Sequence, residues 1–233
     1  MPALFEKTLF EKIVEVIKGP ILQLCVEALR LLPDSMVLGI AILAGLSMSK
    51  PMAVLLFTMF EIMLSQRALS MIIGGIAPVG AKENVLEGVC QTGFLYPNMM
   101  RISLIETIGV PSMFPSPSVF FITSTLTYML LAMQNFGREI KSLSNDLSVR
   151  TNIATVLSTL FIMFMIIFRY TYGCESFGTL LLSVILGLVF GALFVYQNIG
   201  LFGREGVNVL NIPMILSSAE RGKPMYVCAP SDN

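Results

Sequence analysis

The hydrophobic pattern opens with an amphipathic stretch. Apolar residues recur at helical spacing through residues 3–32, with Glu and Lys between them, and Lys7 and Glu11 are i,i+4 neighbours of opposite charge. The break at Gly19-Pro20 predicts a kink, because proline lacks an amide hydrogen and clashes with the preceding turn. We interpret residues 1–32 as an amphipathic interfacial helix lying on a membrane, with an oligomerisation helix as the alternative.

Two short apolar runs follow, at 36–49 and 52–64, with Lys50-Pro51 between them. A helix needs about 20 residues to cross a hydrocarbon core of about 30 Å. The runs therefore form either a tight hairpin or two helices that extend into their flanks. A third run at 71–80 continues the second or makes a re-entrant turn. The sequence thus predicts short apolar helices across residues 33–80.

The second half of the chain is more regular. Residues 81–115 are mixed in character and predict a long outer loop. Three apolar segments within 116–196 then predict spanning helices, at 116–133, 151–168 and 176–196, and residues 197–233 are left as a tail. The basic residues of the connection at 134–150 place it, with the tail, on the cytoplasmic side by the positive-inside rule.

Composition turns this pattern into a fold class. The chain is 55% hydrophobic and 13% charged, whereas soluble domains hold about 45–50% apolar and about 25% charged residues. A soluble protein of this size could not cover its surface with so few charges. We expect one all-α domain over residues 1–233, a polytopic transmembrane helical bundle with about five to six membrane helices. Its location is an integral membrane, and its expected partners are lipids, other membrane proteins or further copies of the chain.

The absence of certain residue types excludes several classes of function. The chain has no His, which removes the commonest general base and metal ligand, so we expect no enzyme, no metal site and no cofactor. Net charge is zero, which argues against binding nucleic acid. Of the four cysteines, Cys90 and Cys174 fall on the same predicted side and could pair, while four free thiols are the equal alternative.

A few polar and small residues stand out within the apolar runs. Glu61 lies in the second run, and Arg67 is a candidate partner; charges at such depth face protein or water rather than lipid, and they would be the groups to examine in a channel or transporter. Ser183, Gly187 and Gly191 share one helix face and let another backbone approach closely. We favour packing within the chain over dimerisation for this stripe.

Residues 114–191 resemble type-2 phosphatidic acid phosphatases in helix order and motif spacing. That family has a Pro-Ser-Gly-His motif opening one helix, and later Ser-Arg, five residues, His, three residues and Asp before the last helix. Here Pro115-Ser116 opens the segment at 116, and Arg169 ends the next segment. Glu175 and Thr179 follow Arg169 at the family's spacing. The resemblance implies a site that binds a lipid phosphate at the bundle mouth.

The family's reacting groups are replaced. Ser118 stands at the first His position, Glu175 at the nucleophilic His and Thr179 at its orienting Asp, so a phosphohistidine intermediate cannot form. We expect Arg169 to lie at the depth of Ser116, with an anion between them. That anion is either the Glu175 carboxylate, which we favour, or a lipid phosphate held by Arg169 and the backbone amides of Ser118 and Val119.

A second resemblance covers much of the chain. Residues 100–121 and 202–233 are similar to uncharacterised multi-pass membrane proteins of large nucleocytoplasmic DNA viruses. This resemblance implies a virion inner membrane or a virus-modified host membrane. The function we expect is a non-enzymatic structural or assembly component of such a membrane. The alternatives are a degenerate phosphatase-like lipid-phosphate binder or enzyme, and a channel or transporter.

Overall fold

The fold was analysed in a computed structural model, which describes residues 22–74, 90, 114–137 and 145–209. Every regular element in these ranges is a helix: α2 (Leu22–Ser47), α3 (Lys50–Gly74), α6 (Pro117–Asn135), α8 (Asn145–Thr171) and α9 (Phe177–Gly206). The all-helical class is therefore confirmed for the part of the chain described. Residues 1–21 of the amphipathic helix expected over 1–32, the outer loop apart from Cys90 and its last residues, and the tail beyond 209 lie outside these ranges. Residues 22–32 form the first part of α2.

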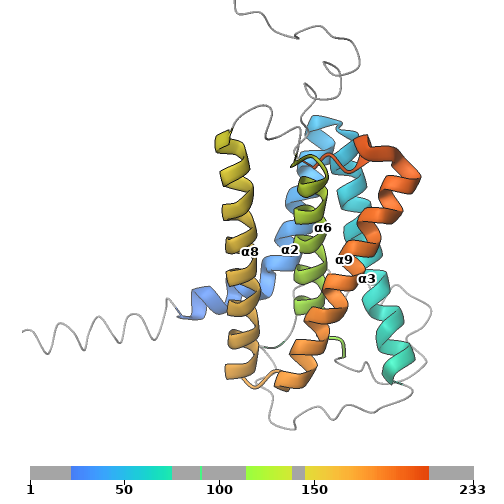
Figure 1. Cartoon of the computed structure of the whole chain (residues 1–233). Helices are drawn as coiled ribbons and strands as arrows, with labels where there is room; N and C mark the ends of the chain where they lie inside the picture. Colours follow the sequence, from blue (N-terminus) through green and yellow to red (C-terminus); the bar gives the residue numbers. More distant parts are fainter. Residues whose placement is uncertain (1–21, 75–89, 91–113, 138–144, 210–233) are drawn as a thin grey trace, which may run out of the picture.

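The two short apolar runs at 36–49 and 52–64 lie in two long helices that form a hairpin, which agrees with the alternative in which each run extends into its flanks. α2 has 26 residues and α3 has 25, and Met48 and Ser49 join them. α2 includes Pro33, and Figure 1 shows the helix bent along its length. The apolar run at 36–49 begins after Pro33 and Asp34, whereas α2 begins at Leu22. Apolar positions on both sides of them pack against α3 and keep α2 continuous.

α9 also runs beyond its expected end. The apolar run stops before Gln197 and Asn198, where the sequence analysis began the tail, but α9 continues to Gly206 with a change of direction at Gly203. Gln197 and Asn198 donate hydrogen bonds to side chains of α3, so both side-chain NH2 groups have partners inside the bundle. The helix therefore has no reason to end there.

α6 lies among the other helices and has the most complete burial (Figure 1). Ten of its 19 residues are buried, and four of these are Ser or Thr. This polar content keeps α6 out of the set of helices apolar enough to cross a membrane by length and composition, which are α2, α3, α8 and α9. The described residues thus provide four candidate spans, and the larger number expected from the sequence stays a prediction.

The outer faces of these helices are apolar. α8 leaves large side chains half exposed or more along its length, among them Ile153, Leu157, Leu160 and Phe164. In water such a surface would drive association, whereas lipid tails cover it without cost. Together with the four spans, this surface identifies an integral membrane protein.

Candidate functional site

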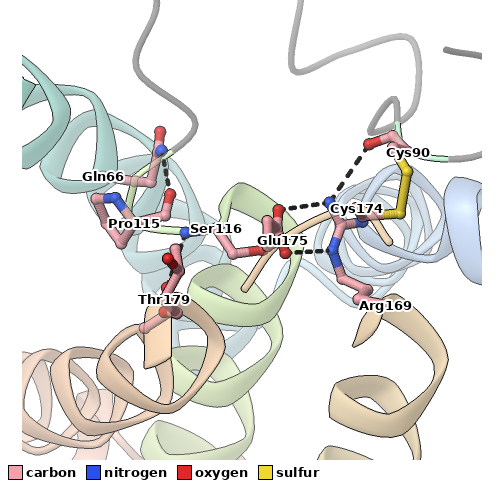
Figure 2. A network of polar contacts seen from close by, with 9 residues as sticks. Gln66, Cys90, Pro115, Ser116, Arg169, Cys174, Glu175 and Thr179 are labelled. Carbon is pink, nitrogen blue, oxygen red and sulfur yellow. Dashed lines mark hydrogen bonds and ion pairs between the residues drawn. A yellow bond between two sulfur atoms is a disulfide. The ribbon is translucent and has the colours of Figure 1, made fainter. Parts of the chain in front are cut away.

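Three helix ends meet at one end of the bundle. Ser116 precedes α6, Arg169 lies in the last turn of α8, and Glu175 lies in the short connection that leads into α9. Figure 2 shows these side chains converging, with Cys90 and Gln66 on either side. The structure therefore brings together three of the four residues that the sequence analysis proposed as an anion site.

A tight turn positions Glu175. The amide of Gly173 donates to the Tyr170 carbonyl at 3.0 Å, and the amide of Cys174 donates to the Arg169 carbonyl at 3.0 Å. These bonds satisfy carbonyls at the end of α8 that have no partner within the helix. Gly173 has φ of 68°, in the left-handed region where a side chain would be strained. The reversal turns the chain back, so Glu175 lies against Arg169.

Arg169 and Glu175 form a two-pronged ion pair. The Nε of Arg169 donates to Glu175 Oε2 at 2.9 Å, and Nη2 donates to Oε1 at 2.7 Å. The two residues are only 5% and 7% exposed. Ser116 Oγ donates to Glu175 Oε1 at 2.9 Å, and Arg169 Nη2 also donates to the Cys90 carbonyl at 3.3 Å. Buried charges are tolerated when paired and hydrogen-bonded in this way.

Ser116 links this ion pair to the rest of the bundle. Its amide donates to Ser183 Oγ at 2.8 Å, and Ser183 Oγ donates to the Thr179 carbonyl at 2.7 Å. Gln66 on α3 donates from Nε2 to the Pro115 carbonyl at 2.9 Å. Residues 115 and 116 are thus held by α3, α9 and the connection before α9. The Glu175 carboxylate lies between Arg169 and the start of α6 and is hydrogen-bonded to both Arg169 and Ser116.

At two positions singled out by the phosphatase resemblance, Ser118 and Thr179, the side chain makes no hydrogen bond with Arg169 or Glu175. The Ser118 side chain is buried, and its hydroxyl has no hydrogen-bond partner among the atoms described. Thr179 belongs to the first turn of α9, where its amide donates to Ser176 Oγ at 3.3 Å as part of a helix cap. Neither residue is placed to orient or protonate Glu175.

The small-residue stripe lies where α9 packs on α6. A methyl group added at Gly187 would come within 2.8 Å of Thr123 Cβ, and one at Gly191 within 2.6 Å of the Ser124 carbonyl oxygen. Ser183, one step along the same face, accepts the Ser116 hydrogen bond. All three small residues therefore serve contacts within this chain.

The intramembrane charges do not pair with each other. Glu61 Oε1 accepts a hydrogen bond from Gln197 Nε2 on α9 at 2.8 Å, and the ion pairs formed by the described residues do not include Glu61 with Arg67. Residues six apart on a helix point about 120° away from each other, which explains the missing pair. The Arg67 partnership suggested by the sequence is therefore wrong.

A buried polar group that the sequence analysis missed lies deeper in the bundle. Asn198 donates from Nδ2 to Thr58 Oγ1 at 2.7 Å and to the Tyr128 hydroxyl at 3.1 Å. These three side chains come from α9, α3 and α6 and are fully buried. The signal was available, because an Asn next to a Gln interrupts an otherwise apolar run and must find partners inside the protein.

The cysteine alternatives left open by the sequence are resolved for three of the four residues. Cys90 and Cys174 form a disulfide across 84 residues of sequence, and Cys25 is an exposed free thiol. Cys228 lies outside the described residues. The disulfide places Cys90 beside the ion pair, as Figure 2 shows.

The polar groups of this site bond mainly to one another and link the helix ends. Its carboxylate is neutralised, and its hydroxyl and guanidinium groups donate to protein oxygens. Searches with protein-family models, curated proteins and solved structures find no match to this chain.

Proposed function

We propose that this chain is a non-enzymatic, multi-pass membrane protein that serves as a structural or assembly component of a viral or virus-modified membrane. The observation that carries the non-enzymatic part is the bidentate ion pair between Arg169 and Glu175. Arginine is the side chain best suited to bind phosphate, and here Glu175 already occupies it. The guanidinium group of Arg169 could bind a ligand, but here its contact with Glu175 joins the end of α8 to the connection before α9, and Glu175 in turn contacts Ser116 before α6.

The phosphatase-like alternative lacks its reacting groups. A covalent mechanism needs an activated nucleophile with a base beside it. Glu175 is tied to Arg169 and Ser116, while Thr179 caps α9. Two of the three guanidinium nitrogens already donate to protein oxygens, so a lipid phosphate would compete with the carboxylate for them. The polar contacts therefore support a structural role for these residues over turnover or phosphate binding.

Hydrolysis of phosphatidic acid tests the non-enzymatic claim. Purified protein in mixed micelles should release no phosphate above a protein-free blank, because the chain has no His and Glu175 is held by Arg169 and Ser116. Glu175→Gln is the diagnostic variant, since it removes the carboxylate that Arg169 binds. Phosphate release by the native protein that disappears in Glu175→Gln would refute the proposal and indicate a carboxylate nucleophile.

A channel or transporter is the second candidate, because polar groups lie inside the bundle. Glu61 with Gln197, and Asn198 with Thr58 and Tyr128, place five such side chains between helices. They bond to one another, which favours helix association as their role. Ion flux into proteoliposomes that falls in Glu61→Gln, with protein-free liposomes as the blank, would favour transport instead.

The viral part of the proposal rests on the sequence resemblance alone. Mass spectrometry of purified particles from the source system tests it directly. Peptides of this chain should co-purify with the particle membrane and leave with it after detergent extraction. Their absence from particles and from membranes of infected cells would remove the viral assignment and leave the structural one standing.

A further inference from the structure

The disulfide and the ion pair are built on the same few residues. Cys174 directly precedes Glu175, and its amide donates to the Arg169 carbonyl at 3.0 Å. Cys90, at the other end of the disulfide, accepts a hydrogen bond from Arg169 Nη2 at 3.3 Å. All four residues are buried. Cys174 therefore contacts the backbone of Arg169, and Cys90 contacts its side chain.

We propose that the disulfide and the ion pair act as one redox-sensitive clasp. Reducing Cys90–Cys174 exposes Arg169, and breaking the Arg169–Glu175 pair exposes the disulfide to reductants. This inference does not depend on the proposed function, since it concerns how one end of the bundle is closed.

The first direction follows from the contacts of the guanidinium. The disulfide keeps the Cys90 carbonyl beside Arg169, where the carbonyl accepts a hydrogen bond and covers the ion pair. A buried guanidinium that loses such an acceptor gains by turning toward water. Once the covalent link is gone, Cys90 is no longer fixed there, so local opening at Arg169 becomes more frequent.

The second direction follows from the turn. Residues 170–175 reverse the chain through Gly173, and Glu175 anchors the far side of that reversal on Arg169. Cys174 lies within it and is 4% exposed. Without the anchor the turn loses its main side-chain restraint, and the disulfide sulfurs become accessible. A reductant reacts only with the opened form, so its rate reports how often the turn opens.

The redox step is ordinary disulfide reduction. A water-soluble phosphine attacks one sulfur and breaks the S–S bond. Water then supplies the oxygen of the phosphine oxide and the protons of the two thiols. The disulfide gains two electrons, and the phosphine loses two.

Reduction kinetics test the second direction. Full-length protein in detergent is treated with tris(2-carboxyethyl)phosphine, and new thiols are counted by mass after alkylation. Glu175→Gln should be reduced faster than the native protein by on the order of tenfold or more, because a buried ion pair has lost one partner. Glu27→Gln is the matched control, since it removes the exposed Glu27–Arg30 pair on α2 and should leave the rate unchanged. Equal rates in all three proteins would contradict the clasp.

Arginine footprinting tests the first direction without disturbing the ion pair by mutation. Phenylglyoxal should modify Arg169 slowly in the oxidised protein and several times faster after reduction or in Cys174→Ser. Arg150 is exposed and should react equally in every sample, which makes it the internal control. If Arg169 stays protected in reduced native protein, the disulfide does not close this end. This arm holds even if Glu175→Gln fails to fold.

Discussion

At the scale of single residues, the ion pair between Arg169 and Glu175 decides the interpretation of the site. A buried pair of this kind is a weak source of net stability compared with apolar packing, but removing one partner leaves an uncompensated charge. Ser116 and the Cys90 carbonyl add hydrogen bonds to the two charged groups. The expected effect of mutation is therefore large although the contribution of the intact pair is modest.

Glu175→Gln should destabilise the folded protein by about 3–5 kcal/mol, because Arg169 is left charged in a buried site. Denaturant unfolding in mixed micelles measures the change. The conservative control is Glu27→Gln, because the Glu27 side chain is 56% exposed and solvent screens its charge, so the effect should stay within about 0.5 kcal/mol. Equal losses in the two variants would show that Arg169 does not depend on Glu175.

At the scale of helices, the contact between α6 and α9 is the closest in the bundle. Gly187 and Gly191 bring α9 directly onto the backbone and threonines of α6. Gly200 lies on the same helix with open space where a side chain would begin. Glycine lowers helix stability by the same intrinsic amount at a packed and at an open position. Replacing Gly191 and Gly200 separately by alanine therefore distinguishes the effect of helix packing from that of helix propensity.

Gly191→Ala should destabilise the bundle by about 1–3 kcal/mol, since the added methyl group meets a backbone oxygen that cannot move aside cheaply. Gly200→Ala should be neutral or stabilising by up to about 1 kcal/mol, because alanine favours the helix. Thermal unfolding followed by circular dichroism in the same detergent compares them. A stable Gly191→Ala protein would mean that α9 does not pack on α6 through this face.

Local pattern predicted much of the helical content but not the contacts between helices. Long apolar runs fix where α8 and α9 lie, because a membrane span needs little more than length and hydropathy. The partner of Glu61 is Gln197, 136 residues away, and no local pattern reports such a pair. The predicted end of α9 at residue 196 was too early because the partner of Asn198, Thr58, is also distant in sequence. The pair of Arg169 and Glu175 was easier to predict, because only six positions of sequence separate the two side chains.

At the scale of the whole molecule, the two ends of the bundle differ. The clasp closes one end, where α6 begins and α8 ends. At the other end Arg204 Nη2 donates to the Asn135 carbonyl at 2.6 Å, and Lys50 Nζ donates to the Phe202 carbonyl at 3.2 Å. Disulfides persist in oxidising compartments, and basic residues are enriched on the cytoplasmic side. Both rules predict the same orientation, with the clasp on the outer or lumenal face.

Sided labelling tests the membrane account most directly. Single cysteines at Ser176, beside the clasp, and at Gly137, beyond the other end of α6, are introduced into a chain carrying Cys25→Ser and Cys228→Ser; both positions are exposed. If the protein lies in the cell surface membrane, an impermeant maleimide added to intact cells should label position 176 and not position 137. If it lies in an internal membrane, the same reagent added to sealed vesicles should label position 137 and not position 176. Labelling of both positions from the same side would contradict a bundle that spans the membrane between them.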